Sequence, residues 1–430
     1  MIPATVVLLL LLLALSLPVA AVLAMLGLAL GNVFAGLPLH RAMGEIAWGA
    51  SSQVILVTVP LFILMGEILL RSGVAERMYD SMVRWTSWLP GGLMHSNIAA
   101  CTMFAATSGS SAATAATIST VSIPEMRKHG YHEGLFLGTL AAGGTLGILI
   151  PPSINLIVYG VLTETSIPQL YLAGFLPGFL LALLFMATVL IACLLRPAWG
   201  GRPAPSDWDA RIASLPALLP PLGLFLVVIG SIYAGIATPT ESASLGVIAA
   251  LGLAAFNRRL TWPMLRLAIE GTMRTTAMIL LIVVAAFFLN FVIAAVGLTR
   301  EINALILDLG LSPLQTILAI VIFYLVLGCF METMAMMITT VPIIAPVVVT
   351  MGYDPIWFGV IVILLVETAM ITPPIGVNLY IVQGVRRDGA LQDIMLGALP
   401  FVLALLATIA LVIAFPRIAL FLPEIWARTR

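Results

Sequence analysis

Apolar residues follow one another along most of this chain in runs long enough to cross a membrane as helices. A spanning helix needs about 20 consecutive, mostly apolar residues. Nine stretches are the best candidates, and we predict that each is one crossing: Ile2–Leu30, Ser51–Leu70, Leu135–Tyr159, Leu170–Leu195, Leu215–Ala234, Ser242–Phe256, Thr276–Val296, Ile356–Val382 and Ile394–Phe415. The first run lacks a charged leader and an obvious cleavage site, so we expect a retained helix, with a cleaved signal peptide as the alternative.

Two further apolar stretches are interrupted at their centres by small or polar residues. Gly91–Pro124 centres on ATSGSSAATAAT, and Ser312–Val349 centres on GCFMETMAMMITT. We predict that each is a re-entrant helical hairpin, which enters the membrane, turns at its tip and leaves on the same side. Non-helical backbone at membrane depth is tolerated only where protein or a water-filled cavity surrounds it. Both tips are therefore expected to line a site.

Two of the predicted crossings contain adjacent prolines followed closely by an asparagine. The first reads GILIPPSINLIVYG (147–160), and the second reads ITPPIGVNLYIVQG (371–384). Proline removes a backbone donor and disfavours helical geometry in the residue before it, so a proline pair frees carbonyls and starts a new half-helix. Freed carbonyls suit a hard cation, and the N-terminus of the half-helix suits an anion. Each break therefore predicts a cation site beside an anion site.

The same series of parts occurs twice along the chain. Each half has a helix, an amphipathic or short connecting segment (Arg71–Trp88, then Gly297–Leu311), a hairpin and a broken helix. Basic residues concentrate in cytoplasmic loops. With the first hairpin opening inward, 14 of the 19 lysines and arginines face the cytoplasm, and only Arg41, Arg300, Arg417, Arg428 and Arg430 lie outside.

This orientation places the N-terminus in the cytoplasm, the C-terminus in the periplasm, and the two hairpins on opposite sides. Inverted repeats with broken helices are the architecture of secondary transporters. We therefore predict an all-α polytopic membrane protein built from inverted repeats, each with a re-entrant hairpin and a broken transmembrane helix. The predicted parts are scaffold helices and an arm (1–90), the first hairpin, broken helix and following helix (91–195), a cytoplasmic linker (196–214), further scaffold helices and an arm (215–311), and the second hairpin, broken helix and last helix (312–430).

Composition supports a membrane protein and excludes several other classes. Hydrophobic residues make up 61% of the chain and charged residues 9%, against about 25% charged residues in soluble domains. The net charge is zero, so no basic surface suggests nucleic acid. The three cysteines lie in apolar stretches and indicate buried small side chains, not disulfides or metal ligands.

Oxygen-bearing residues at the tips and breaks are the candidate ligands. At the first tip, the hydroxyls of Thr107, Ser108, Ser110 and Ser111 surround Gly109, and with the carbonyls of Gly147 and Ile150 they would suit Na⁺. The second tip offers Gly328, Glu332 and Thr333, completed by Thr372 and the carbonyls before Pro373. We expect Asn155 and Asn378 to join tips to breaks by hydrogen bonds. Glu332 and Glu367 lie at membrane depth, where acidic residues are functional by default.

Several motifs together resemble one transporter family. SGSSAATAATIS, GTLGILIPPSINLIVYG, GIATPTESA and TPPIGVNLYIVQG resemble the large membrane subunit of tripartite ATP-independent periplasmic (TRAP) transporters, over about Val54–Phe415. The resemblance implies an elevator-type, Na⁺-coupled carrier of the ion-transporter superfamily in the bacterial inner membrane. TPTE (238–241) also matches, and we interpret it as a turn and capping motif.

The resemblance also implies site residues and partners. One Na⁺ site would use Ser108, Ser110, Gly147, Ile150 and Pro152; the other would use Gly328, Glu332, Thr333, Thr372 and Pro374. A small organic anion would bind between the tips, with Ser110, Ser111, Asn155, Thr333 and Asn378 as its contacts. The implied partners are a small four-helix membrane subunit, expected as a separate polypeptide because none precedes Met1, and a periplasmic substrate-binding protein.

Other functions stay open at this stage. A stand-alone elevator-type Na⁺/carboxylate symporter has the same intramembrane features. An intramembrane hydrolase would use Glu332, Glu367 or the serines, but the sequence has no Gly-x-Gly-Asp or His-Glu-x-x-His motif and no histidine at membrane depth. An anion channel is disfavoured because sites inside occluding hairpins favour alternating access.

Overall fold

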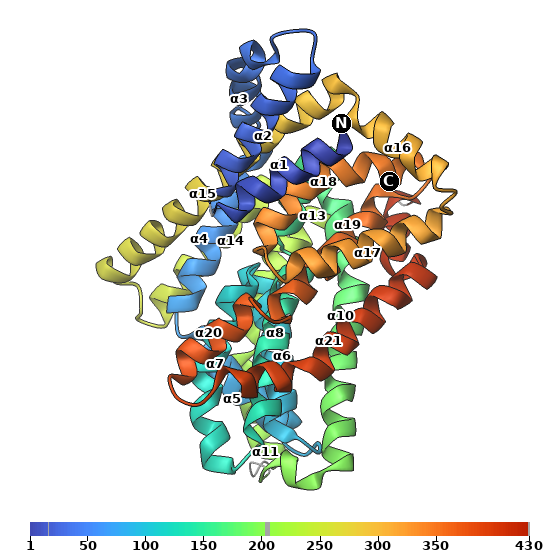
Figure 1. The fold of residues 1–430 in the computed structure, drawn as a ribbon. Coiled ribbons are helices and arrows are strands. Elements are labelled where there is room, and N and C mark those ends of the chain that lie inside the picture. Colours follow the sequence, from blue (N-terminus) through green and yellow to red (C-terminus); the bar gives the residue numbers. More distant parts are fainter. Residues whose placement is uncertain (16, 203–206, 429–430) are drawn as a thin grey trace.

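The computed structural model describes residues 1–15, 17–202 and 207–428, and this part of the chain contains helices and no strand (Figure 1). The helices of the first half are α1 (Ile2–Ala14), α2 (Val19–Phe34), α3 (Met43–Ser51), α4 (Thr58–Arg71), α5 (Val74–Thr86), α6 (Gly92–Ser108), α7 (Ser111–His129), α8 (Glu133–Leu149), α9 (Ile154–Thr163) and α10 (Ile167–Leu195). Those of the second half are α11 (Trp208–Ser214), α12 (Leu219–Phe225), α13 (Ser231–Tyr233), α14 (Pro239–Phe256), α15 (Trp262–Val296), α16 (Leu298–Asp308), α17 (Pro313–Gly328), α18 (Thr333–Thr350), α19 (Pro355–Ile371), α20 (Val377–Arg386), α21 (Leu391–Ala414) and α22 (Arg417–Arg428).

Both hairpins and both broken helices predicted from the sequence are present. The hairpins are α6–α7 and α17–α18, and the proline pairs separate α8 from α9 and α19 from α20. The two halves place α5 and α16 in the same position, directly before a hairpin, yet these arms lie at opposite ends of the molecule (Figure 1). The second half therefore repeats the first in the opposite orientation.

The predicted single helix Ile2–Leu30 is wrong. The chain forms two helices here, α1 and α2, and Pro18 is the residue before α2. Proline disfavours helical geometry in the residue that precedes it, and hydropathy does not reveal the break because both flanks are apolar. At about 1.5 Å per residue, the 13 residues of α1 reach only about 20 Å. Instead of crossing alone, α1 packs against α2 and the arm α16.

The number of crossings changes accordingly. By length and apolar composition, six helices in the described part of the chain can span a membrane, or up to eight when each bent pair is one span. The predicted crossing Leu215–Ala234 is also irregular, since a π-helical turn (Leu226–Gly230) joins α12 to α13. In contrast, α15 extends 14 residues further toward the N-terminus than the predicted Thr276 start, so that Arg266 and Arg274 lie on this helix.

The predicted linker 196–214 is partly structured, and its residues 203–206 lie outside the described residues. The Trp199 ring stacks on His132 with 4.3 Å between ring centroids, and the Arg202 amide donates to the His129 carbonyl at 2.9 Å. The start of the linker is therefore attached to the turn between α7 and α8.

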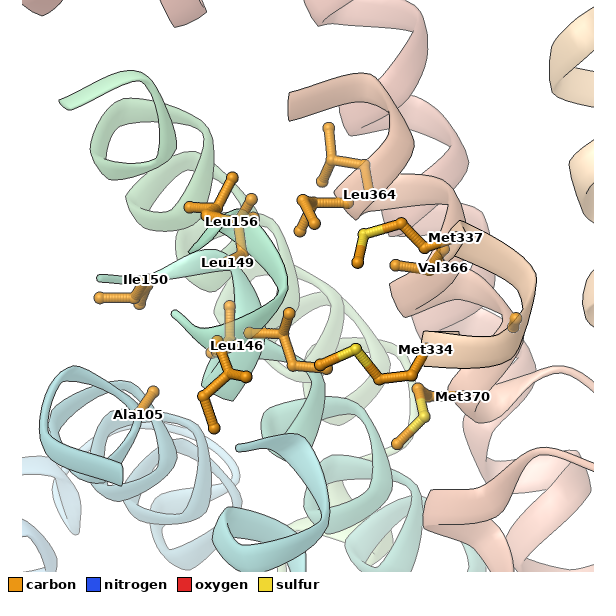
Figure 2. Close-up of a cluster of buried hydrophobic side chains, with 14 of the residues drawn as sticks. Ala105, Leu146, Leu149, Ile150, Leu156, Met334, Met337, Leu364, Val366 and Met370 are labelled. Atoms are coloured by element: carbon orange, nitrogen blue, oxygen red, sulfur yellow. The ribbon is translucent and has the colours of Figure 1, made fainter. Parts of the chain in front are cut away.

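Helix contacts form two groups. Helices α2, α3, α4, α14 and α15 pack on one another, whereas α8 packs against α6, α7, α19 and α21. Around the first break, Leu146, Leu149, Ile150 and Leu156 are buried among Met334, Met337, Leu364, Val366 and Met370 of α18 and α19 (Figure 2). The hairpins and broken helices of both repeats thus share one apolar core.

A buried arginine joins the ends of the two repeats. The Arg386 side chain is 3% exposed; its Nε lies 2.9 Å from Glu133 and its Nη2 lies 3.1 Å from Asp393. We expect Arg386→Ala to lower the free energy of unfolding by about 1–3 kcal/mol, because its hydrogen bonds to two carboxylates and the packing of its buried side chain are lost. The measurement is thermal unfolding in detergent. Arg266→Ala, which removes an exposed pair with Glu270, should cost less than about 1 kcal/mol; equal losses in both variants would contradict the prediction.

Candidate functional site

The first hairpin tip is a tight, polar turn. Helix α6 ends at Ser108, Gly109 adopts φ +64°, and Ser110 caps α7 by accepting a hydrogen bond from the Ala113 amide at 3.3 Å. The hydroxyls of Ser108 and Thr114 lie 2.9 Å apart, and Thr114 donates to the Ser110 carbonyl at 2.8 Å. Several oxygens of hydroxyls and carbonyls therefore surround this turn.

The first break lies directly against this tip. Ile150 to Ser153 separate α8 from α9, the Pro151–Pro152 peptide is cis, and the helices meet at 42°. A Cβ added at Gly109 would lie 2.7 Å from the Pro152 carbonyl oxygen, and one added at Gly147 would lie 2.6 Å from the Ser110 carbonyl oxygen. Such close approach of two backbones requires glycine at both positions.

A buried acid from the other repeat completes this region. Glu367 of α19 is fully buried, and both of its carboxylate oxygens lie 3.5 Å from the Ser111 hydroxyl. The same hydroxyl lies 3.3 Å from the Thr145 carbonyl oxygen. The single hydroxyl proton of Ser111 is therefore shared among three acceptor oxygens. No lysine, arginine or histidine forms an ion pair with Glu367 among the described residues. The sequence marked this glutamate as notable but did not place it at the first tip.

The second tip and break are more open. Glu332 is exposed and caps α18, since it accepts from the Ala335 amide at 3.1 Å and from the Thr333 hydroxyl at 2.8 Å. Gly328 packs on Ala369, close to the break. The Pro373–Pro374 peptide is cis, and Pro374 is exposed, whereas every residue from Gly147 to Leu162 is buried. The two sites are thus related in position and different in exposure.

Both asparagines occupy the second position of their half-helix. Asn155 follows Ile154 of α9, and Asn378 follows Val377 of α20. Asn155 follows Pro152 by three residues and Asn378 follows Pro374 by four, and the extra residue lies in the turn before α20. Asn378 donates to the Ala141 carbonyl of α8 at 3.0 Å, so it joins the repeats and does not clamp the second tip as expected.

Two buried amide atoms have no partner within the protein. The Asn155 Nδ2 donor and the Asn378 Oδ1 acceptor make no hydrogen bond within the described part of the chain. Buried polar atoms are normally paired, so these two atoms are available to a bound molecule. No group of three or more histidine, cysteine, aspartate or glutamate side chains is close enough to hold a metal in the described residues. A cation here would be bound by hydroxyl and carbonyl oxygens.

The TPTE motif has the structural role predicted for it. Thr238 and Glu241 form a reciprocal capping box at the start of α14, in which the Thr238 amide donates to the Glu241 carboxylate at 2.8 Å. These residues therefore stabilise a helix N-terminus and do not belong to the tips or breaks.

Known proteins resemble this chain over almost its whole length. Residues 6–418 match the family model described as "Tripartite ATP-independent periplasmic transporter, DctM component". The chain is 33% identical to the C4-dicarboxylate TRAP transporter large permease protein DctM of Pseudomonas aeruginosa, over 89% of this chain and 90% of that protein. It is 32% identical to the sialic acid TRAP transporter large permease protein SiaM of Vibrio cholerae, over 88% of each chain. It is 34% identical to the ectoine/5-hydroxyectoine TRAP transporter large permease protein UehC of Ruegeria pomeroyi, over 86% of each.

Two solved structures share the fold. The YdaH transporter of Alcanivorax borkumensis matches with a TM-score of 0.68 at 16% identity, over 92% of this chain and 96% of that one. MtrF of Neisseria gonorrhoeae matches with a TM-score of 0.59 at 13% identity, over 88% of this chain and 84% of that one. At these identities the likeness concerns the fold alone.

Proposed function

Because the chain belongs to the family of large permease components of tripartite ATP-independent periplasmic transporters, we propose that it imports an organic anion together with Na⁺. The chain is a multi-pass membrane protein and a transporter component, not an enzyme. Relatives of nearly equal identity are named for C4-dicarboxylates, sialic acid and ectoine, so overall identity does not select a substrate. The proposed class is a carboxylate-containing anion, such as a C4-dicarboxylate or a sialic or sugar acid.

One observation carries the Na⁺ proposal: the first tip and the first break lie in direct contact. This contact gathers the Ser108 hydroxyl and the Ser110 and Pro152 carbonyls around glycines 109 and 147. Carbonyls of unwound helices are typical ligands of coupling cations in transporters. Ser108, Ser110, Gly147, Ile150 and Pro152 are the proposed ligands here, and Gly328, Glu332, Thr333, Thr372 and Pro374 are proposed at the second tip.

The anion is proposed to bind between the tips. The N-terminus of a half-helix carries partial positive charge and unpaired N–H groups, and both asparagines lie at such N-termini with a free amide atom. Ser110, Ser111, Asn155, Thr333 and Asn378 are the proposed contacts. Bound Na⁺ would order the tips and so create the anion site, and linkage requires the anion to strengthen Na⁺ binding equally.

The proposed movement is that of an elevator. Helices α6–α10 and α17–α21 would carry the sites across the membrane, against a scaffold that includes α2–α4, α14 and α15, with α5 and α16 as connecting arms. Packing within each group is denser than the contacts of α4 and α15 with α6, α9 and α18 that join the groups, which supports this division. Proposed partners are a small four-helix membrane subunit and a periplasmic substrate-binding protein, in the bacterial inner membrane. The cytoplasmic N-terminus predicted from the sequence is not kept, because the Met1 amine pairs with Glu301 of α16 at 2.9 Å, at the end of the molecule opposite the arm α5 (Figure 1).

Uptake into proteoliposomes tests the proposal. We expect the chain, reconstituted with its small subunit, to accumulate one member of a panel of labelled carboxylates only with an inward Na⁺ gradient and the cognate binding protein. Each inward positive charge gains about 2.3 kcal/mol per 100 mV, so an imposed negative interior should increase accumulation when Na⁺ charge exceeds anion charge.

Other outcomes of this experiment would support one of the alternative functions. Na⁺-driven uptake without a binding protein, together with failure to co-purify a small membrane subunit, would indicate a stand-alone symporter. Downhill flux that no Na⁺ gradient changes would indicate an anion channel and overturn Na⁺ coupling.

A further inference from the structure

A cavity lies at the far end of the two helices that start at the first tip and the second break. Helix α7 begins at the first tip, α20 begins at the second break, and the two helices pack together. Near their C-terminal ends they enclose about 600 Å³, lined by Thr120, Ile123, Pro124, Arg127, Gly384, Val385, Arg386 and Arg387. At about 1.5 Å per residue, the 16 steps from Ser111 to Arg127 place this cavity about 24 Å from the tip.

The walls of this cavity carry three arginines and no acidic residue. Arg386 is engaged with Glu133 and Asp393, and Arg127 pairs with Asp388 at 2.5 Å. Two of these carboxylates, Glu133 and Asp388, line the adjacent cavity of about 440 Å³. Arg387 is exposed and takes part in none of the ion pairs of the described residues, so its guanidinium is available to a ligand.

Exposed residues of α7 and α20 lead to this cavity. On α7, Thr120 and Pro124 are exposed one turn apart, and on α20, Tyr380 and Gly384 are exposed one turn apart. Residues four apart lie on the same face of a helix. Because Thr120, Pro124 and Gly384 line one cavity, these faces adjoin each other.

The other repeat provides an internal comparison. Helix α9 corresponds to α20, both have ten residues, and their C-caps Glu164 and Arg387 both adopt left-handed backbone with φ of +54° and +66°. The cavity beside α9 holds about 350 Å³ between α9, α15 and α18, and it is lined by Glu164 and by no basic residue. We call these two cavities the mouths of the repeats. The mouth beside Arg127 and Arg387 carries basic side chains, and the opposite mouth, beside Glu164, carries an acidic side chain.

We propose that the cavity beside Arg127 and Arg387 is a low-affinity exit site, where a transported carboxylate rests on its way from the tips to the cytoplasm. Guanidinium groups bind carboxylates by paired hydrogen bonds. The exposed Arg387 is the main contact and Arg127 the second. The opposite mouth lacks such a contact, so an anion is retained only on the exit side. This inference rests on the proposed anion transport.

Cysteine modification tests the site without any transport. The probes are the anionic sulfonatoethyl and the cationic trimethylammonioethyl methanethiosulfonates, applied to Thr120→Cys in inside-out vesicles; the parent chain gives the background of Cys101, Cys193 and Cys329. In water, a positive charge about 7 Å from the modified cysteine raises the modification rate of the anionic reagent about threefold and lowers that of the cationic reagent about threefold. Arg387→Gln should therefore lower the anionic-to-cationic rate ratio about sevenfold, and Arg266→Gln should leave it unchanged. Val349→Cys in the opposite mouth, treated in right-side-out vesicles so that the charged reagents reach it, should favour the cationic reagent.

Succinate then tests carboxylate binding. At about 10 mM it should slow the anionic reagent at Thr120→Cys severalfold, and Arg387→Gln should abolish this protection. Three results would overturn the exit site: a rate ratio that Arg387→Gln does not change, no protection by succinate at Thr120→Cys, or equal protection at Val349→Cys. These results do not depend on uptake, so failure of the transport assay with intact protection would count against the proposed function alone.

Discussion

Replacing Gly147 by alanine is expected to reduce Na⁺-driven uptake at least about tenfold, although alanine favours a helix by about 1 kcal/mol over glycine. The added Cβ would lie 2.6 Å from the Ser110 carbonyl oxygen and 2.8 Å from the Thr114 hydroxyl. A backbone carbonyl cannot rotate away as a side chain does, so the first tip must move off the break. The proposed cation ligands would then separate, and the Na⁺ concentration for half-maximal uptake should rise.

Gly252→Ala is the matched control for this change. Gly252 also lies inside a helix, α14, but nothing lies within 4 Å of its added Cβ. This variant should retain uptake and gain slightly in stability. Wild-type Na⁺ dependence in Gly147→Ala would show that the tip–break contact is not needed for coupling.

Glu367→Gln is expected to have the second large effect. A carboxylate buried without a cationic partner is costly, and the Na⁺ ligands proposed at the first tip adjoin Ser111, which contacts Glu367. At an effective dielectric constant of about 20 and a separation of about 6 Å, one negative charge attracts bound Na⁺ by at most about 2.8 kcal/mol, and part of this attraction is used to keep the buried carboxylate ionised. We therefore expect the half-maximal Na⁺ concentration for uptake to rise at least about tenfold and at most about 100-fold.

The comparison variants separate charge from hydrogen bonding. Glutamine keeps an oxygen that accepts from Ser111, so a purely structural Glu367 would give a near-wild-type Glu367→Gln protein. Ser111→Ala should raise the Na⁺ requirement much less than Glu367→Gln, because it keeps the charge. Glu270→Gln, at an exposed helix position, should change nothing.

The parts of the fold with local signals could be predicted from the sequence. Proline pairs mark both broken helices because proline cannot continue hydrogen bonding in a helix. The small and polar centres of Gly91–Pro124 and Ser312–Val349 predict the hairpins because such residues do not form a simple apolar span. The capping box at Thr238 and Glu241 is likewise a local pattern.

Features that depend on long-range packing could not be predicted. The contact between Glu367 and Ser111 joins residues 256 positions apart, and no local pattern indicates it. The break near Pro18 is hidden because both flanks are equally apolar. The equivalence of Asn155 and Asn378 depends on where each half-helix begins, which the proline spacing does not specify. The roles assigned to the tip residues remain predictions.

Na⁺ binding to the purified chain tests the central claim most directly, since it needs neither substrate nor partners. A ligand that binds only the folded state stabilises it by RT ln(1 + [L]/Kd), which is about 2.7 kcal/mol at 100 times Kd. We predict that Na⁺, but not K⁺ at equal ionic strength, raises the thermal unfolding midpoint of the wild-type chain and of Gly252→Ala, and that Gly147→Ala loses most of this increase. Equal stabilisation by both ions, or full Na⁺ stabilisation of Gly147→Ala, would contradict a Na⁺ site at the first tip and break.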